Sequence, residues 1–192
     1  KEQIAKEIEG MGASLTSGSG RNTYYVSSSA LSEDFERAMD LFADVLRNPS
    51  FPEAEIEKQR KDVLLAIKKL DENWQTEIIR MFKRHYFHNH PYKNDLLGTE
   101  KSIKALKRKD IVNFYKSLVM PNNAVIAVFG DIDREKVLEG IKKHFGNWKK
   151  GKLPEVKLPD ETSPLKKNET FKKKNEKVSA SIFIGTNGTT IY

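Results

Sequence analysis

The sequence predicts an α+β fold, in which several amphipathic helices accompany a small number of strands. Three observations favour this class. Apolar residues recur at helical spacing in many segments of the chain. Two short β-rich segments flank a glycine-containing connection, which indicates a hairpin. The continuous apolar run Ala124–Phe129 is too short for a helix and is typical of a central strand.

The N-terminal part is expected to form a helix followed by the hairpin. Lys1–Met11 has helical apolar spacing, and Gly12 fits the stop of that helix. The predicted strands are Ala13–Ser17 and Asn22–Ser28, joined by the turn Gly18–Arg21. The Gly-Ser-Gly of that turn lacks the strand-to-helix context and the Lys-Ser/Thr of a phosphate-binding loop, so a hairpin turn is favoured.

Six further helices are predicted along the chain. Ser32 is the expected N-cap of the first, which ends at Asn48-Pro49, and Pro52 opens the second. The second carries a buried stripe that includes Ile67. The others are Gln75–Phe87, a short turn at Ser102–Leu106, Lys109–Val119, and a helix that Asp133 caps and that continues to Phe145.

The amino-acid composition of the chain changes from about Gly146. Lys149–Lys177 combines prolines with many charges, which indicates a linker or an extended crossing segment. Val178–Ile184 again predicts a strand, and the chain stops soon after it, so we expect the strand to open a second domain.

Composition excludes several classes of protein. The 192 residues are 38% hydrophobic and 32% charged, which is typical of a globular protein, and the absence of cysteine excludes disulfides, cysteine zinc sites and cysteine nucleophiles. The net charge of +7 and the pI of about 9.4 would suit nucleic acid. However, few aromatic residues interleave the lysine-rich stretches Lys142–Lys152 and Lys166–Lys177, so a solvated lysine surface is favoured.

An ordered set of sequence blocks extends from Lys1 to about Trp148. Ala38–Glu53 is the most specific block. The other blocks are Glu7–Leu15, Arg21–Val26, His90–Tyr92, Leu97–Ile103, Pro121–Val125, Gly130–Asp133 and Phe145–Trp148. In order and spacing this set resembles the pitrilysin/insulinase (M16) family of zinc metallopeptidases, of the mitochondrial-processing-peptidase-like type.

The resemblance implies a mainly antiparallel sheet covered by helices, in a unit incomplete at both ends. Residues 1–148 would form a domain of this family without its metal-motif part, 149–177 a linker, and 178–192 the first strand of a following domain of the same type. Two or four such units enclose a chamber, so the expected partners are a homologous unit and a peptide substrate. Zinc-activated water cuts peptides there, and the zinc needs three protein ligands and one open position.

The family's metal ligands are the two histidines of a His-x-x-Glu-His motif and a glutamate on a later helix. No His-x-x-Glu-His occurs in this sequence, and the position expected for the third ligand holds Ile67, which cannot bind zinc. Glu72 is the nearest glutamate in sequence, but it lies more than a helical turn further on. The resemblance therefore implies no catalytic or metal-binding residue in this chain.

The favoured reading is a non-catalytic half or subunit that walls the peptide chamber, with zinc expected in the parent protein or in a partner unit. Two alternatives stay open. The same fold could serve as a scaffold or binding module without proteolysis. An active unit truncated before its metal motif would need Glu72 or another carboxylate as ligand.

Other candidate groups have simpler interpretations. Imidazoles suit transition metals, but His85 and His88 are expected at the end of a helix and His90 in a turn, so the three need not converge. Asp131 and Asp133 follow a predicted strand, where a turn residue and an N-cap explain them better than acid–base chemistry. Two tryptophans, Trp74 and Trp148, are expected to be partly buried anchors.

Overall fold

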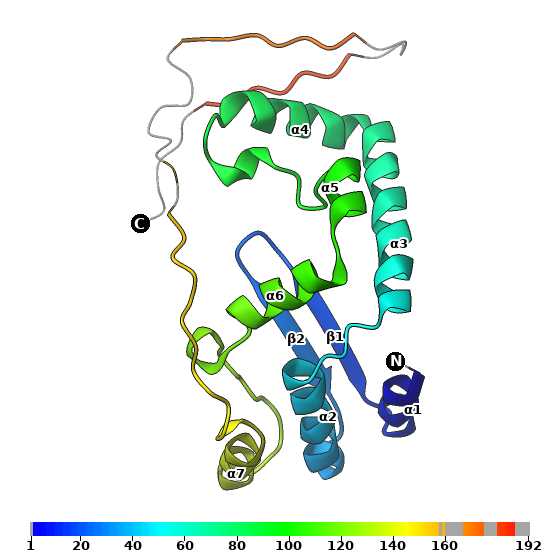
Figure 1. The fold of residues 1–192 in the computed structure, drawn as a ribbon, viewed down its shortest axis with the longest axis vertical. Coiled ribbons are helices and arrows are strands. Elements are labelled where there is room, and N and C mark those ends of the chain that lie inside the picture. Colours follow the sequence, from blue (N-terminus) through cyan, green and yellow to red (C-terminus); the bar gives the residue numbers. More distant parts are fainter. Residues whose placement is uncertain (1, 158, 160–166, 175–179, 187–192) are drawn as a thin grey trace. The chain divides into compact units, whose positions relative to one another are not determined.

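The computed structural model describes residues 2–157, 159, 167–174 and 180–186. The chain divides into two compact units (Figure 1). One consists of residues up to 52 together with residues 107–154, and the other consists of residues 53–106 together with the described residues from 155 onward. The described part is rich in helix and contains one small antiparallel sheet, which agrees with the predicted α+β class.

The first unit begins with helix α1 (Glu2–Gly10) and an antiparallel hairpin of strands β1 (Ser14–Ser19) and β2 (Tyr24–Ser29). Gly12 has a φ of +59°, a conformation that glycine adopts without steric cost, and it ends the helix as expected. Ser17 pairs with Val26 in the ladder. The hairpin prediction is therefore confirmed, with boundaries shifted by one or two residues.

Helix α2 (Phe35–Arg47) packs against helix α7 (Arg134–Phe145) and forms the core of this unit. The buried residues of the core are Met39, Ala43 and Phe145. The cap prediction for Asp133 is confirmed, because its carboxylate accepts a hydrogen bond of 3.0 Å from the backbone N–H of Lys136.

The N-cap prediction for Ser32 is wrong. A 3₁₀ turn, η1 (Ser32–Asp34), precedes α2, and neither Leu31 before the turn nor Asp34 before the helix makes a side-chain capping bond. The extra turn moves the start of the α-helix three residues beyond Ser32. Several amide groups at a helix start can be satisfied by 3₁₀-type bonds, so no side-chain cap is required there.

Helix α6 (Arg108–Leu118) is tied to the chain that follows α2. Arg108 donates hydrogen bonds to the carbonyls of Phe51 (2.8 Å) and Ser50 (2.9 Å). The Tyr115 hydroxyl donates to the Leu46 carbonyl, and the Phe51 and Tyr115 rings meet edge to face at 5.3 Å. Burial, with a smaller contribution from Tyr24, raises the pKa of Tyr115 to about 12.

The prediction that Ala124–Phe129 forms a central strand is wrong for the described part of the chain. This run follows a 3₁₀ turn, η3 (Pro121–Asn123), and it joins no ladder with the described residues. Ile126 and Val128 pack against the α2–α7 core, whereas Val125 is 97% and Phe129 91% exposed. A strand is stabilised by neighbouring strands, and the apolar pattern alone does not supply them.

The second unit is built on two long helices, α3 (Glu53–Glu72) and α4 (Trp74–Tyr86). Asn73 separates them and caps α4, since its side chain accepts a hydrogen bond of 3.0 Å from the Thr76 amide. A 3₁₀ turn, η2 (Pro91–Lys93), packs on α4, and α5 (Glu100–Ala105) packs on α3. Arg60 of α3 donates to the carbonyls of Ile103 and Leu106 and so fixes α5.

Two extended segments complete this unit, residues 167–174 and 180–186, and both run along α4 (Figure 1). The strand predicted at Val178–Ile184 lies partly outside the described residues, and its described part, residues 180–184, carries no strand ladder. The expected domain boundaries near residues 148 and 177 stay predictions.

Candidate functional site

The position expected for a zinc ligand is apolar and buried. Ile67 lies in the C-terminal half of α3 and is 8% exposed, with Val63 and Leu70 partly buried on the same helix face. An isoleucine side chain has no lone pair with which to bind a cation. The residues of this helix therefore do not fit the third zinc site of the peptidase family that the sequence resembles.

Glu72, the alternative ligand, is the last residue of α3 and is exposed. Within the described ranges, no three histidine, aspartate or glutamate side chains gather closely enough to hold a metal ion. Glu72 is therefore not part of a three-ligand group in the described chain.

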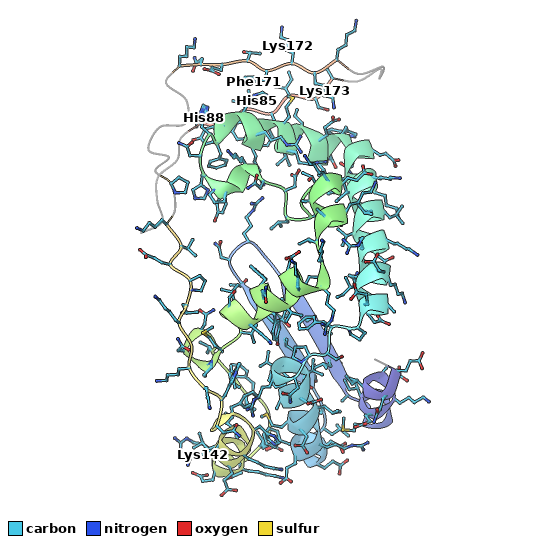
Figure 2. The ribbon with its side chains drawn as sticks, in the orientation of Figure 1. His85, His88, Lys142, Phe171, Lys172 and Lys173 are labelled. Carbon is cyan, nitrogen blue, oxygen red and sulfur yellow. The ribbon has the colours of Figure 1, made fainter. Side chains whose placement is uncertain are left out.

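The three histidines near the end of α4 have separate structural contacts. The His85 ring stacks on the Phe171 ring, with centroids 3.7 Å apart (Figure 2). His90 accepts a hydrogen bond at Nδ1 from the Tyr92 amide (3.2 Å), and the His88 carbonyl accepts one from the Lys93 ammonium (2.6 Å). Among the described residues, these histidines do not belong to any group of three or more side chains that could hold a metal ion.

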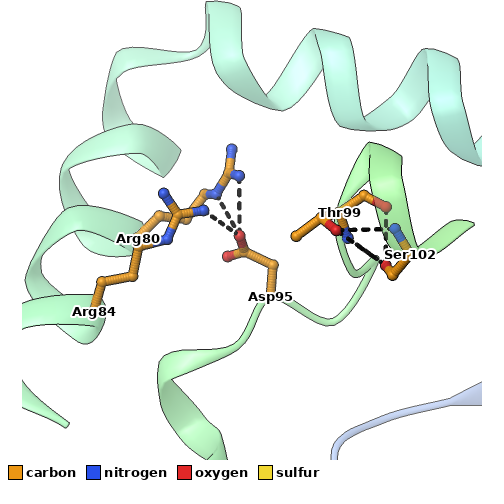
Figure 3. Close-up of polar contacts among 5 residues, drawn as sticks. All are labelled: Arg80, Arg84, Asp95, Thr99 and Ser102. Atoms are coloured by element: carbon orange, nitrogen blue, oxygen red, sulfur yellow. Dashed lines mark hydrogen bonds and ion pairs between the residues drawn. The ribbon is translucent and has the colours of Figure 1, made fainter. Parts of the chain in front are cut away.

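The loop after α4 is held by a carboxylate between two guanidinium groups (Figure 3). Asp95 Oδ2 lies 2.9 Å from Arg80 and 2.8 Å from Arg84. Partial burial alone would raise the pKa of Asp95, but the hydrogen bonds and charges of the two arginines outweigh it and hold that pKa below its usual value. Next to it, Thr99 and Ser102 form a reciprocal capping box at the start of α5.

A concave feature of this unit lies between α4 and the two extended segments, and we call it the α4 groove. Its floor is the apolar face of α4, and its walls are residues 167–174 and 180–186, enclosing about 1300 Å³. The floor residues are Trp74, Ile78, Met81, Phe82 and Tyr86.

Both wall segments are anchored on α4 by specific contacts. The Phe183 ring lies 4.8 Å from the Phe82 ring, and an added Cβ at Gly185 would fall 2.2 Å from Phe82. On the other segment, Phe171 stacks on His85 and Lys173 pairs with Glu77. Because Phe171 and Lys173 are two residues apart in an extended chain, they share the face that meets the helix.

The sequence did not point to the groove. Trp74, which was expected to be a partly buried anchor, is 51% exposed and lines the groove. Trp148 agrees with the expectation, since it is partly buried beside Phe145 at 5.8 Å. One feature of the sequence could have indicated this contact with α4: Phe171 is an isolated aromatic residue within a lysine-rich stretch.

Two family models match the chain. The model of the insulinase peptidases, peptidase family M16, matches residues 1–100, which is more than half of the chain. The chain belongs to this family. A second model, the inactive domain of peptidase family M16, matches residues 105–192.

Similar curated proteins include two kinds of mitochondrial protein and a bacterial one. The chain is 29% identical over 172 residues to the β subunit of the mitochondrial processing peptidase of Bos taurus, covering 83% of this chain and 35% of that protein. It is 28% identical over 144 residues to an uncharacterized zinc protease of Mycobacterium leprae (75% and 32%) and to cytochrome b-c1 complex subunit 1 of Bos taurus (74% and 30%). The chain thus spans about a third of the length of these relatives.

Solved structures support the same fold. A peptidase M16 inactive domain from Pseudomonas fluorescens has a TM-score of 0.74 at 25% identity, covering 81% of this chain and 38% of that one. A protease from Helicobacter pylori has a TM-score of 0.68 at 24% identity, covering 82% and 38%. The predicted fold class and family are therefore confirmed. No described helix of this family member combines the length and the hydrophobicity needed to cross a membrane.

Proposed function

We propose that this insulinase-family chain is part of a non-catalytic half or subunit of a zinc-dependent peptidase and that it walls the chamber in which another unit cuts peptides. The observation that carries the proposal is the buried Ile67 at the position where the family's third zinc ligand is expected. In this account zinc belongs to a homologous catalytic unit, on the same polypeptide or on a separate subunit, and the substrate is a peptide. Residues 1–148 would be one domain of the family, and residues 178–192 would open the next.

The comparisons support this proposal in two ways. The relatives include a processing-peptidase subunit and a zinc protease by name, and the C-terminal half of the chain matches a model described as inactive. A second candidate, a scaffold without proteolysis, has its own support, because one relative is named as a subunit of the cytochrome b-c1 complex. An intact His-x-x-Glu-His in the remainder of the protein or in a co-encoded partner would favour the peptidase.

The first test is the zinc content of the purified 192-residue chain, measured by inductively coupled plasma mass spectrometry before and after dialysis against a chelator. We expect less than about 0.1 zinc per chain after dialysis, because a structural or catalytic site needs three or four converging ligands. Near-stoichiometric zinc that survives dialysis would contradict the proposal. It would make His85, His88, His90 and Glu72 the residues to mutate next.

An Ile67→Glu variant sharpens this test. We expect the variant to bind no more zinc than the parent chain and to be less stable by about 2 kcal/mol or more, because a carboxylate replaces a buried apolar group. Circular dichroism reports the stability, and the same mass spectrometry reports the metal. Zinc binding gained by this one change would mean that other ligands of this chain already lie around position 67, and it would contradict the proposal.

A further inference from the structure

The connection from α2 to α3 is held by an arginine of the first unit. The chain leaves this unit after Pro52 and returns to it at Lys107. Arg108, the first residue of α6, donates hydrogen bonds to the carbonyls of Ser50 at 2.9 Å and Phe51 at 2.8 Å. A guanidinium at the start of the returning chain thus holds two consecutive carbonyls at the end of the outgoing chain.

The connection from α5 back to α6 is held in the same way in the second unit. Arg60, on α3, donates to the carbonyls of Ile103 and Leu106, the latter at 2.7 Å. Its side chain is 15% exposed and also pairs with Glu57 at 3.0 Å. Here a residue of the outgoing chain holds two carbonyls of the returning chain. The outgoing and the returning connections are therefore tied together once within each unit.

The guanidinium group suits this kind of contact. Its N–H donors point in fixed directions from a planar fork, so one side chain can bind two carbonyls at once, whereas an ammonium group acts as a point charge. Arg108 uses Nε for Phe51 and a terminal nitrogen for Ser50. Carbonyls of a connecting segment have no helix or strand partner, so they are free to accept from such a side chain.

Phe51 has an unfavourable backbone conformation at the same place. Its φ is +47°, in the left-handed region where a bulky side chain is a rare outlier. Among the described residues it is the only residue other than glycine with a positive φ. Pro52 follows it, and a residue before proline favours extended backbone with a negative φ. The hydrogen bonds from Arg108 therefore hold a conformation that the segment alone does not favour.

Tyr115 adds to the hold on this segment. It lies seven residues after Arg108, which is two turns further along the same face of α6. Its ring meets the Phe51 ring edge to face at 5.3 Å, and its hydroxyl donates to the Leu46 carbonyl near the end of α2. One face of α6 therefore fixes both the end of α2 and the connection that follows it.

We propose that Arg60 and Arg108 are the two clamps of a hinge between the units and that Phe51 is its strained element. When Arg108 releases the carbonyls of Ser50 and Phe51, the φ of Phe51 changes sign and the connection from α2 to α3 turns. Hinges act through a few loop residues that absorb such a change of φ and ψ. The hinge needs neither zinc nor a peptide, so its test is independent of the proposed chamber function.

Fluorine NMR of the 192-residue chain labelled with 4-fluorophenylalanine tests the clamp at Phe51. The chain has ten phenylalanines, and the Phe51 signal is assigned by its loss in Phe51→Leu. We expect one Phe51 signal in the parent chain, and a second one in Arg108→Gln from an open state that is at least about tenfold more populated. The other phenylalanine signals should keep their positions. An unchanged Phe51 signal, or an equal change at every phenylalanine, would overturn the proposal.

Two further variants separate the guanidinium fork from its charge. Arg108→Lys keeps the charge without the fork, so we expect the Phe51 signal to change nearly as much as in Arg108→Gln. The matched control, Arg134→Gln, removes the same group from a side chain of α7 that is 80% exposed, and should leave the Phe51 signal as in the parent. A parent-like signal in Arg108→Lys, or an altered one in Arg134→Gln, would contradict the clamp.

Double electron–electron resonance tests the hinge itself. The chain has no cysteine, so cysteines introduced at the exposed positions Glu36 of α2 and Lys61 of α3 are the only sites for spin labels. We expect a narrow distance distribution in the parent, and one about twofold wider or more in Arg108→Gln and in Arg60→Gln, at unchanged helix content by circular dichroism. Arg108→Lys takes the place of Arg108→Gln if the latter loses helix. A distribution that is already as wide in the parent, or a clamp variant that does not widen it, would overturn the hinge.

Discussion

At the residue scale, the carboxylate of Asp95 holds the loop after α4 in the second unit. Asp95 accepts from Arg80, whose side chain is 15% exposed, and from Arg84, and it thereby holds the loop after α4 against that helix. Hydrogen bonds between charged groups are stronger than neutral ones, and removal of one partner leaves the other with an unmet desolvation cost. The loop is therefore sensitive to the loss of a single charge.

We expect Asp95→Asn to lower the free energy of unfolding by about 1–2 kcal/mol, because the amide cannot replace a carboxylate between two guanidinium groups. Chemical denaturation followed by circular dichroism measures the change. The control is Glu100→Gln, which removes an exposed pairing with Lys104 and should leave the denaturation midpoint unchanged. An equal loss in both variants would contradict a special role for Asp95.

The same carboxylate predicts how stability depends on pH. The pKa of Asp95 is lower in the folded chain than its usual value, so the contribution is present above about pH 4, the pKa of an unfolded aspartate. It is lost as the pH falls through the folded-state pKa. The stability difference between the parent chain and Asp95→Asn should therefore be constant near neutral pH and shrink below about pH 4. A constant difference down to acid pH would contradict this account.

At the scale of elements, the first unit is held by the packing of α2 against α7. Phe145 is 8% exposed and meets the Phe42 ring edge to face at 6.4 Å, while Trp148 lies on its other side. Gly140 on the same helix allows close approach, since an added Cβ would lie 3.3 Å from the Phe35 ring. The close packing of the two helices therefore depends on the large side chain of Phe145 and on the absence of a side chain at Gly140.

We expect Phe145→Ala to destabilise the chain by about 3 kcal/mol, because it removes a buried ring and leaves a cavity between α2 and α7. The matched control is Leu138→Ala, on the same helix but 37% exposed, with an expected loss below about 1 kcal/mol. Thermal and urea denaturation measure both. Similar losses in the two variants would mean that the α2–α7 contact is not the core of this unit.

At the scale of the whole molecule, the described chain exposes apolar segments beyond the groove. Val125 and Phe129 lie almost fully in solvent on a β-competent segment, and Phe114 is 69% exposed. Unpaired apolar segments of high β-propensity favour association between chains.

We therefore expect Val125→Lys with Phe129→Lys to reduce concentration-dependent light scattering by the chain, because charges oppose strand pairing between copies. A Val156→Lys with Leu31→Lys variant adds the same two charges at positions that are 74% and 61% exposed outside this segment; it is the control and should change the scattering little. An equal reduction by the control would show that net charge, and not this segment, governs association.

The sequence by itself determined the local elements and the family. Helical stripes, the Gly12 stop, the hairpin and the Asp133 cap depend on residues within a few positions of each other, and the ordered blocks identified the family without any coordinates. Ile67 was also visible in the sequence as a non-ligand at a ligand position, and the tertiary structure adds that it is buried.

Only the tertiary structure decided which of these elements have partners. The run Ala124–Phe129 has the pattern of a central strand, yet it pairs with no strand in the described ranges, because pairing depends on distant strands that its own residues do not encode. The contact of Phe171 with His85 likewise requires that residues 86 positions apart in sequence meet. Local chemistry fixes helices and turns, whereas a groove exists only where the fold brings remote segments side by side.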